Sequence, residues 1–177
     1  MSVTRVAVLG TGSWGTTFAA VLADAGCEVT VWGRRAEVCD EIAQRHTNEA
    51  YLPGIVLPGG VTATTDAARA LAGAQLVAVA VPAQSARATL EPLAGLVDRD
   101  AVVVSLMKGV ELASDQRMSE VVGQALAVPA ERVAVLSGPN LSREVASGLP
   151  GATVIASAEA SLDDLSAAFH TPAFRVY

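Results

Sequence analysis

The sequence contains few cysteines, few aromatic residues and a single lysine. Its cysteine content and its charge argue against a disulfide-rich protein, a metal site and a nucleic-acid-binding protein. Its 177 residues carry 12 basic and 18 acidic side chains, which gives a formal net charge of −6. Non-specific nucleic-acid binding relies on a basic face, so nucleic acid is not an expected partner. The two cysteines, Cys27 and Cys39, lack the spacing of a metal site or a disulfide framework. We interpret both as reduced structural residues and expect no bound metal.

No apolar run in the sequence is suited to crossing a membrane. Residues 6–23 contain no charged side chain, and their length approaches the roughly 20 residues that span a bilayer. Gly, Ser and Thr crowd residues 10–17, however, so the apolar segment is interrupted soon after it begins. A secretory signal requires an unbroken apolar centre after a positive start. We therefore expect a cytoplasmic protein without membrane insertion.

Short β-branched runs alternate along the chain with segments of helical periodicity. Hydrophobic residues make up 51% and charged residues 17%, so we expect a folded domain and not a disordered chain. Strands are predicted over residues 5–9, 29–32, 61–64, 76–81, 101–105, 133–137, 153–156 and 174–177. Helices are predicted over residues 14–25, 36–45, 67–71 (capped by Asp66), 83–96, 115–126, 141–146 and 162–169. This alternation predicts an α/β fold, a Rossmann-like doubly wound, mostly parallel sheet with helices on both faces.

Three glycines interrupt the first apolar run with the spacing G-x-G-x-x-G, in AVLGTGSWGTTFAA. Gly10 permits a tight turn after the first strand, Gly12 lets the backbone approach a pyrophosphate, and Gly15 lets the next helix pack closely. The N-terminus of that helix offers free N–H groups to phosphates. The pattern predicts a dinucleotide site, and we assign residues 1–177 to one dinucleotide-binding domain. A turn that merely needs glycines is the alternative.

The end of the second predicted strand indicates which dinucleotide binds. A carboxylate about 20 residues past the glycines holds the ribose 2′-hydroxyl of NAD, but VTVWGRR has Arg34 and Arg35 there. Two guanidinium groups suit a 2′-phosphate, so NADP is favoured, with NAD as the second choice. The alternative is that Arg35 only opens the next helix. Tyr51, in the long loop over residues 46–60, covers the adenosine end of the cofactor or merely packs.

Eleven of the 12 basic residues are arginine, and the only lysine is Lys108. It follows a predicted strand in SLMKGVE, and a second stretch, SGPNLSREVA, follows the next strand. Both stretches lie at the strand ends where open α/β sheets bind ligands. A lone lysine indicates a need for a compact ammonium, with chance as the alternative. Asn140 is also the expected N-cap of the helix after it, and Glu111 either pairs with an arginine or is solvated.

Together with GTGSWGTTFA and NEAYLPGIVLP, these two stretches resemble the NAD(P)-dependent glycerol-3-phosphate dehydrogenase family of bacterial type. The resemblance implies the N-terminal cofactor domain of an oxidoreductase that interconverts sn-glycerol 3-phosphate and dihydroxyacetone phosphate for glycerophospholipid synthesis. It implies Lys108 as a catalytic residue that also binds substrate beside Gly138 and Asn140. The full set expected to bind the cofactor is Gly10, Gly12, Ser13, Trp14, Gly15, Arg34, Arg35, Tyr51, Lys108 and Ser142.

The resemblance further implies a separate, mainly helical domain that carries a second lysine as the general base, and a homodimer of the complete enzyme. This sequence has no second lysine, so we expect it to hold half of an active site and to be inactive alone. Its last residues, FRVY, look like a strand that has just begun, which indicates that the helical domain is absent. A non-catalytic NAD(P)H-sensing module would also explain the missing lysine. Another two-domain NADP-dependent reductase would share the glycines but not KGVE with SGPNLSREVA.

Overall fold

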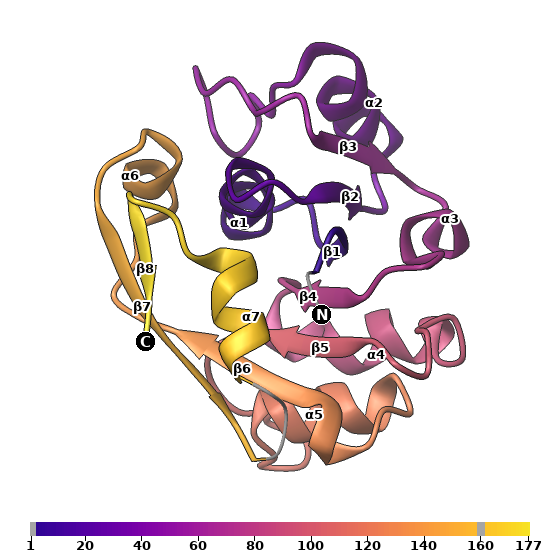
Figure 1. Ribbon diagram of the computed structural model, residues 1–177. Helices are drawn as coiled ribbons and strands as arrows, with labels where there is room; N and C mark the ends of the chain where they lie inside the picture. Colours follow the sequence, from indigo (N-terminus) through magenta and orange to yellow (C-terminus); the bar gives the residue numbers. More distant parts are fainter. Residues whose placement is uncertain (1–2, 159–161) are drawn as a thin grey trace.

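The computed structural model describes residues 3–158 and 162–177, which form an eight-stranded sheet with helices on both sides (Figure 1). The strands are β1 (Arg5–Leu9), β2 (Glu28–Trp32), β3 (Val61–Thr64), β4 (Leu76–Val79), β5 (Val102–Ser105), β6 (Val133–Ser137), β7 (Gly151–Ser157) and β8 (Phe174–Val176). Their order across the sheet is β3-β2-β1-β4-β5-β6-β7-β8. Strands β1 to β6 are parallel, β7 is antiparallel to β6, and β8 is parallel to β7. The predicted Rossmann-like, mostly parallel α/β fold is confirmed.

Helices cover both faces of the sheet. They are α1 (Ser13–Asp24), α2 (Ala36–Arg45), α3 (Ala67–Leu71), α4 (Ala86–Leu90), α5 (Met118–Ala125), α6 (Ser142–Ala146) and α7 (Leu162–Phe169), with short 3-10 turns η1 (Ala83–Ser85), η2 (Glu91–Leu93) and η3 (Ala130–Arg132). Side chains alternate between the faces of a strand, so Val6 and Val8 of β1 join one buried cluster while Ala7 and Leu9 join the other. Helices α1, α2 and α7 contribute to the first cluster, and α3, α4 and α5 to the second. Burial on both faces explains the continuous apolar runs of these strands.

The connections reverse direction beside β1. The chain passes from β1 outward to β2 and β3, then returns to place β4 on the other side of β1. The carboxyl ends of β1 and β4 therefore adjoin at a topological switch point, which is where open α/β sheets bind ligands. This position is set by strand order alone, before any side chain is considered.

An aromatic cluster joins the last elements of the chain to α1. The ring centroid of Phe18 in α1 lies 5.3 Å from that of Phe169 in α7 and 6.4 Å from that of Phe174 in β8. Trp14, at the start of α1, lies 6.2 Å from Phe18 and 6.5 Å from Phe174. Buried aromatic pairs at these separations add to the stability gained by burial of their area. The cluster thus packs β8 and α7 against the helix that follows the glycine turn, and β7 is paired with β8.

Two helix predictions were wrong in extent. The single helix predicted over residues 83–96 is divided into η1, α4 and η2. Helix α4 ends just before Pro92 in η2, which has no N–H to donate to a helix. The helix predicted to begin at Asp115 begins at Met118, since Asp115 has a left-handed φ of +55°. Residues 110–117 instead form a turn that is closed by a bridge between Val110 and Arg117.

The predicted N-caps had different outcomes. Asp66 caps α3, because its side chain accepts the N–H of Arg69 at 3.1 Å. Asn140 does not cap α6: the N-cap position is Leu141, which makes no side-chain capping bond. The other predicted strands and helices begin and end within two residues of their observed bounds.

Candidate functional site

The glycine turn after β1 is shaped by backbone contacts that leave no room for side chains at two of its positions. Gly10 has a φ of +124°, and a Cβ there would lie 2.9 Å from the carbonyl carbon of Ala80 and closer still to its oxygen. A Cβ at Gly15 would collide with the carbonyl of Gly10. Gly12 differs, because nothing lies within 4 Å of the position its Cβ would take. Two glycines therefore serve the turn itself, and the third faces open space.

A cleft of about 460 Å³ lies over this turn, at the switch point between β1 and β4. It brings together most of the residues predicted to bind a cofactor. Its lining is Gly10, Thr11, Gly12, Ser13, Trp14, Trp32, Gly33, Arg34, Arg35, Tyr51, Ala80, Val81, Pro82 and Thr89. Gly15 is buried inside α1 beneath the turn and does not line the cleft.

The two arginines at the end of β2 are exposed but held differently. The guanidinium of Arg35 lies 5.1 Å from the ring centroid of Tyr51, and its Nε lies 3.7 Å from Glu37 Oε1. Arg35 also occupies the N-cap position of α2, so it both opens the helix and reaches the cleft. Among the described residues, Arg34 makes no hydrogen bond or ion pair. Its side chain is thus available to an anion, and no carboxylate of β2 or α2 lines the cleft.

Asn48, which was not predicted as a site residue, ties the long loop to the glycine turn. Its side chain has no solvent exposure, and its Nδ2 donates to the Thr11 carbonyl at 3.0 Å and to Thr16 Oγ1 at 2.8 Å. Thr16 Oγ1 in turn donates to the same carbonyl at 3.3 Å. Little in the sequence indicates this contact, because Asn48 is a single asparagine in a loop that is longer than most.

Lys108 lies in a second, smaller pocket of about 240 Å³, which shares Trp14 with the cleft. Its lining is Trp14, Leu106, Lys108, Leu136, Ser137, Gly138, Asn140 and Ser142. The Lys108 ammonium donates to the Gly138 carbonyl at 2.9 Å. Asn140 Nδ2 is buried without a hydrogen-bond partner in the described part of the chain. A pocket lined by a cation and an unpaired donor suits an oxygen-rich ligand.

Ser142 comes to this pocket at the first turn of α6. Thr17 of α1 donates its hydroxyl to the Ser142 carbonyl at 3.1 Å, so α6 is fixed beside the helix that follows the glycine turn. The structure thus brings together Trp14, Lys108, Gly138, Asn140 and Ser142, which come from three separate stretches of sequence.

Glu111 pairs with an arginine and is not solvated. Arg87 lies 2.9 Å from its Oε2 through Nη2, and the glutamate side chain is only 9% exposed. The hydrogen bond from Arg87, followed by that from Ser114, lowers the pKa of the Glu111 carboxyl. The same hydrogen bond raises the pKa of Arg87. Both groups are therefore charged at neutral pH.

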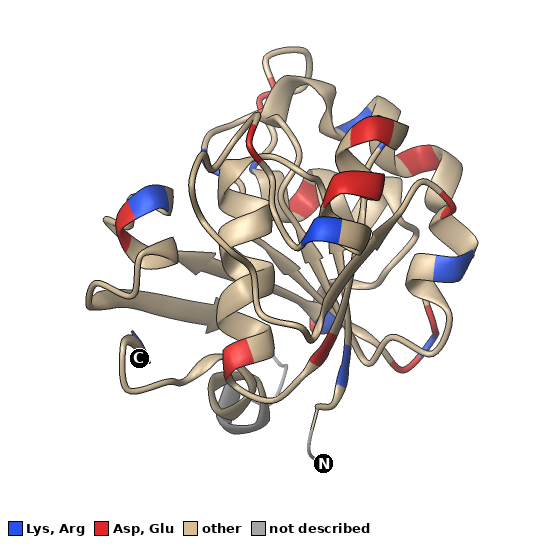
Figure 2. Ribbon diagram, turned by 90° about the horizontal axis from the view of Figure 1, so that it is seen from above, with Lys and Arg blue, Asp and Glu red and all other residues tan. Residues whose placement is uncertain are grey.

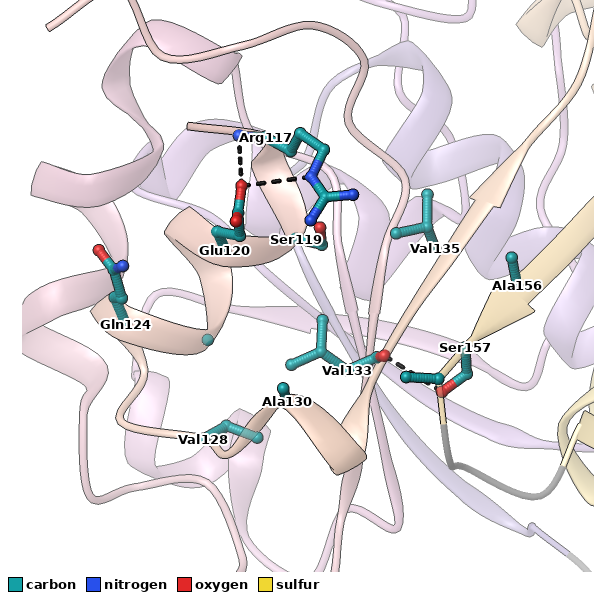
Figure 3. A pocket seen from close by; sticks show the side chains of 12 residues that line it. Arg117, Ser119, Glu120, Gln124, Val128, Ala130, Val133, Val135, Ala156 and Ser157 are labelled. Carbon is teal, nitrogen blue, oxygen red and sulfur yellow. Dashed lines mark hydrogen bonds and ion pairs between the residues drawn. The ribbon is translucent and has the colours of Figure 1, made fainter. Parts of the chain in front are cut away.

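Another hollow, with a mainly apolar lining, lies elsewhere. It has a volume of about 540 Å³ and lies between α5, β6 and β7, lined by residues such as Val133, Val135 and Ala156 (Figure 3). None of the predicted site residues lines it. Basic and acidic positions are interspersed along the ribbon in the view of Figure 2. None of the helices in the described ranges is long and apolar enough to cross a membrane.

Comparison with known families gives this geometry its context. Residues 5–163 match the family described as NAD-dependent glycerol-3-phosphate dehydrogenase N-terminus. The chain belongs to this family. The matched range contains every residue predicted for the site, so both pockets lie within the family's domain.

Known relatives and structures agree with the family assignment. The chain is 56% identical over 174 residues to a glycerol-3-phosphate dehydrogenase (NAD(P)+) of Streptomyces griseus and 47% identical to one of Corynebacterium diphtheriae, with 98% of this chain covered in each case. The alignments cover 52% and 53% of those proteins, so the chain spans about half the length of the curated relatives it matches.

Solved structures of similarly named enzymes have the same fold. The glycerol-3-phosphate dehydrogenase of Coxiella burnetii superimposes with a TM-score of 0.88 and 33% identity, over 98% of this chain and 53% of that one. The enzyme of Saccharomyces cerevisiae gives 0.87 and 27%, over 99% and 56%.

Proposed function

We propose that the chain is the dinucleotide-binding half of an NAD(P)-dependent glycerol-3-phosphate dehydrogenase, which interconverts sn-glycerol 3-phosphate and dihydroxyacetone phosphate. The observation that carries the proposal is the pair of pockets that meet at Trp14. One has the form of a phosphate-binding turn with arginines at its far end, and the other holds the only lysine. A nicotinamide cofactor that extends from the first to the second would bring its reactive ring toward Lys108.

The residues present fit such a cofactor. The space outside Gly12 is open, and the N-cap of α1 is a glycine without a side-chain capping bond. The first N–H groups of α1 therefore remain free to bind a pyrophosphate, which the helix dipole also favours. Ser13 and Trp14 would flank the pyrophosphate, with Arg34, Arg35 and Tyr51 at the adenosine end. Once bound, the cofactor supplies hydride transfer at its nicotinamide ring.

Lys108 has the chemistry that the substrate requires. Oxidation of the C2 alcohol removes a hydride from carbon and a proton from the hydroxyl, so negative charge develops on oxygen. An ammonium fixed next to that oxygen stabilises this charge, and the unpaired Asn140 Nδ2 offers a second donor. The pocket lining contains no carboxylate or histidine, and the sequence has no second lysine. The proton acceptor would therefore come from outside these 177 residues.

We propose NADP as the preferred cofactor, because Arg34 and Arg35 stand where a carboxylate would select NAD. Loss of both guanidinium groups removes charge-assisted hydrogen bonds worth about 1.5–3 kcal/mol each. Arg34→Ala combined with Arg35→Ala is expected to weaken NADPH binding by about tenfold or more and to spare NADH. Fluorescence titration of the 177-residue chain measures both affinities. Arg69→Ala, on an exposed arginine of α3 outside the cleft, is the matched control. Equal losses for NADPH and NADH would reject the assignment.

A non-catalytic NAD(P)H sensor would bind the cofactor but have no use for the second pocket. Amine-selective labelling separates the two functions, because Lys108 is the only lysine and the N-terminal amine serves as internal reference. With NADPH bound, dihydroxyacetone phosphate is expected to slow labelling of Lys108 and not of the N-terminus. No protection of Lys108 at saturating substrate would favour the sensor.

The proposal extends to a cytoplasmic location, which is the expectation drawn from the sequence, and to a homodimer of the complete enzyme, which the family resemblance implies. Sedimentation of the complete enzyme tests the second point, and a monomeric mass would contradict it.

A further inference from the structure

The loop that carries Lys108 is fastened to α4 through a glutamate three residues further along the chain. We propose that Glu111, held by Arg87, is a positioning residue that fixes the Lys108 ammonium in its pocket. This inference rests on the proposed function, in which that ammonium faces the cofactor and substrate. Glu111 does not line either pocket, so it acts on the site only through the loop.

The contact between Glu111 and Arg87 is a two-pronged ion pair. Arg87 Nε donates to both carboxylate oxygens, at 3.1 and 3.2 Å, and Nη2 donates to Oε2 at 2.9 Å. The Ser114 hydroxyl donates to the same Oε2 at 2.5 Å. Charge-assisted forks of this kind fix direction as well as distance. The carboxylate is therefore held from α4 on one side and from its own loop on the other.

Arg87 also links this loop to α5. Its Nη2 reaches Gln116 Oε1 at 2.9 Å and Gln124 Oε1, in α5, at 3.2 Å. Within the loop, Glu111 N–H donates to the Gln116 carbonyl at 2.9 Å, and Asp115 N–H donates to the Glu111 carbonyl at 2.8 Å. The turn over residues 111–116 is thus a closed unit whose anchor is the Glu111 side chain.

A second side chain holds the residues on either side of Glu111. Gln84 of η1 donates to the Val110 carbonyl at 2.8 Å and accepts the N–H of Leu112 at 3.1 Å. The hydrogen bonds from Gln84 and the ion pair from Arg87 both come from residues 84–87, where η1 leads into α4. Residues 110–112, which follow Lys108 in its loop, are therefore positioned by one short segment in η1 and α4.

Lys108 needs an anchor on that side. Leu106 and Met107 before it are buried, but Gly109 after it has a φ of +100° and is exposed. Glycine restricts the backbone less than any other residue, so the rigid point after Lys108 is the turn anchored by Glu111. The Lys108 ammonium lies 2.9 Å from the Gly138 carbonyl, and restraint of the backbone on both sides of the lysine favours that position by reducing the number of competing ones.

Labelling of Lys108 in the chain without ligands tests the inference directly. The measured quantity is the rate of amine acylation at Lys108 relative to the N-terminal amine, by mass spectrometry. Glu111→Ala is expected to raise this ratio by roughly threefold to tenfold, as loss of a hydrogen bond to a charged group allows. Arg87→Ala should do the same, and Arg87→Lys should restore it only in part because an ammonium cannot form the fork.

The matched control is the other glutamate–arginine pair of this region. Glu120 accepts from Arg117 Nε at 3.3 Å at the start of α5 (Figure 3), with side chains 44% and 76% exposed. Glu120→Ala is expected to leave the Lys108 ratio unchanged. A ratio that rises equally in this variant would mean that any lost ion pair disturbs the loop, and would overturn the proposal.

Thermal melts separate positioning from a purely structural role. A folded Glu111→Ala protein with a lower Tm and a wild-type labelling ratio would overturn the inference. If Glu111→Ala does not fold, two other variants are used, because neither leaves a charge unpaired. Gln84→Ala removes the hydrogen bonds to Val110 and Leu112, and Ser114→Ala removes the hydrogen bond to the Glu111 carboxylate. Wild-type ratios in both would also overturn it, and so would a ratio raised only in Gln84→Ala, which would assign the positioning to Gln84. A raised ratio in Ser114→Ala, whose hydroxyl binds the Glu111 carboxylate, supports it. Because the comparison needs no ligand, failure of the proposed function shows separately, as absence of NADPH binding by the unmodified chain.

Discussion

The cofactor cleft and the lysine pocket share Trp14 and lie at the same edge of the sheet, yet they are built in different ways. The cleft is formed by backbone: Gly10 and Gly15 allow close contacts, and the arginines at its far end are exposed side chains. The lysine pocket depends on side chains, since the loop of Lys108 is held from α4 through Arg87 and Glu111. The shape of the turn in the first region is therefore changed by altering backbone sterics. The second can be changed from residues that never touch a ligand.

The largest expected effect comes from the lysine pocket itself. Within a complete glycerol-3-phosphate dehydrogenase that contains this domain, Lys108→Ala is expected to lower kcat by about a hundredfold or more, as loss of one preorganised donor does. Steady-state kinetics measure this effect. Lys108→Arg should not restore the rate, because a guanidinium is planar, larger and differently hydrated.

Binding of 2′,5′-ADP sharpens this prediction, because that fragment fills only the proposed adenosine end of the cleft. Its affinity for the 177-residue chain is expected to be the same with lysine or alanine at position 108. Normal turnover in the Lys108→Ala enzyme would make the lysine an ordinary loop residue.

Alanine at two glycines should separate folding from binding in the cleft. Gly10→Ala forces a Cβ against the Ala80 carbonyl at a left-handed φ, and such overpacking costs about 1–3 kcal/mol or more of stability. Gly12→Ala meets no protein atom, so it should leave Tm unchanged. It should weaken NADPH binding by about tenfold or more, because the backbone must approach the pyrophosphate there. Thermal melts and titrations measure the two quantities, and a Gly12→Ala protein with wild-type affinity would contradict the phosphate assignment.

The contrast between the regions also explains what the sequence could predict. The glycine turn and the strands were predictable because their signals are local: a fixed glycine spacing and continuous apolar runs buried on both faces. The lone lysine was recognised by composition. Arg87 and Glu111 are 24 residues apart and Asn48 and Thr11 are 37 apart, and no local pattern indicates which polar side chains will meet across such distances.

The wrong element bounds have a similar origin. Apolar periodicity over residues 83–96 concealed the effect of Pro92, which has no N–H to donate. Periodicity from Asp115 onward concealed a turn whose shape depends on the Glu111 side chain and on a left-handed φ at Asp115. In both places a local preference for helix was overridden by a backbone constraint. The turn that precedes α5 is also the one that we propose positions Lys108.

Each region also contains a carboxylate whose pKa is lowered, but for different reasons. Near the cleft, Glu41 of α2 accepts the N–H of Glu49 at 2.8 Å and the hydroxyl of Thr47 at 2.9 Å, both from the loop that follows the helix, and these two hydrogen bonds lower the pKa of Glu41. At the lysine loop, the largest cause of the lowered pKa of Glu111 is the hydrogen bond from the Arg87 cation. One carboxylate is thus held mainly by neutral donors and the other by a charge.

The smallest expected effect follows from this difference. A carboxyl with a lowered folded-state pKa stabilises the fold at neutral pH, and that contribution is lost as the pH falls from the ordinary glutamate value of about 4.3 through the folded-state pKa. Wild type should therefore melt a few degrees at most above both Glu111→Gln and Glu41→Gln at neutral pH, and both differences should vanish under acid conditions. Added salt at neutral pH should reduce the Glu111→Gln difference and leave the Glu41→Gln difference nearly unchanged, because screening acts on an ion pair more than on hydrogen bonds from neutral donors. Thermal melts measure how the Tm difference between wild type and each of the two variants changes with pH and with salt. A Glu41→Gln difference as sensitive to salt as that of Glu111→Gln would mean that the two regions are held by the same kind of force.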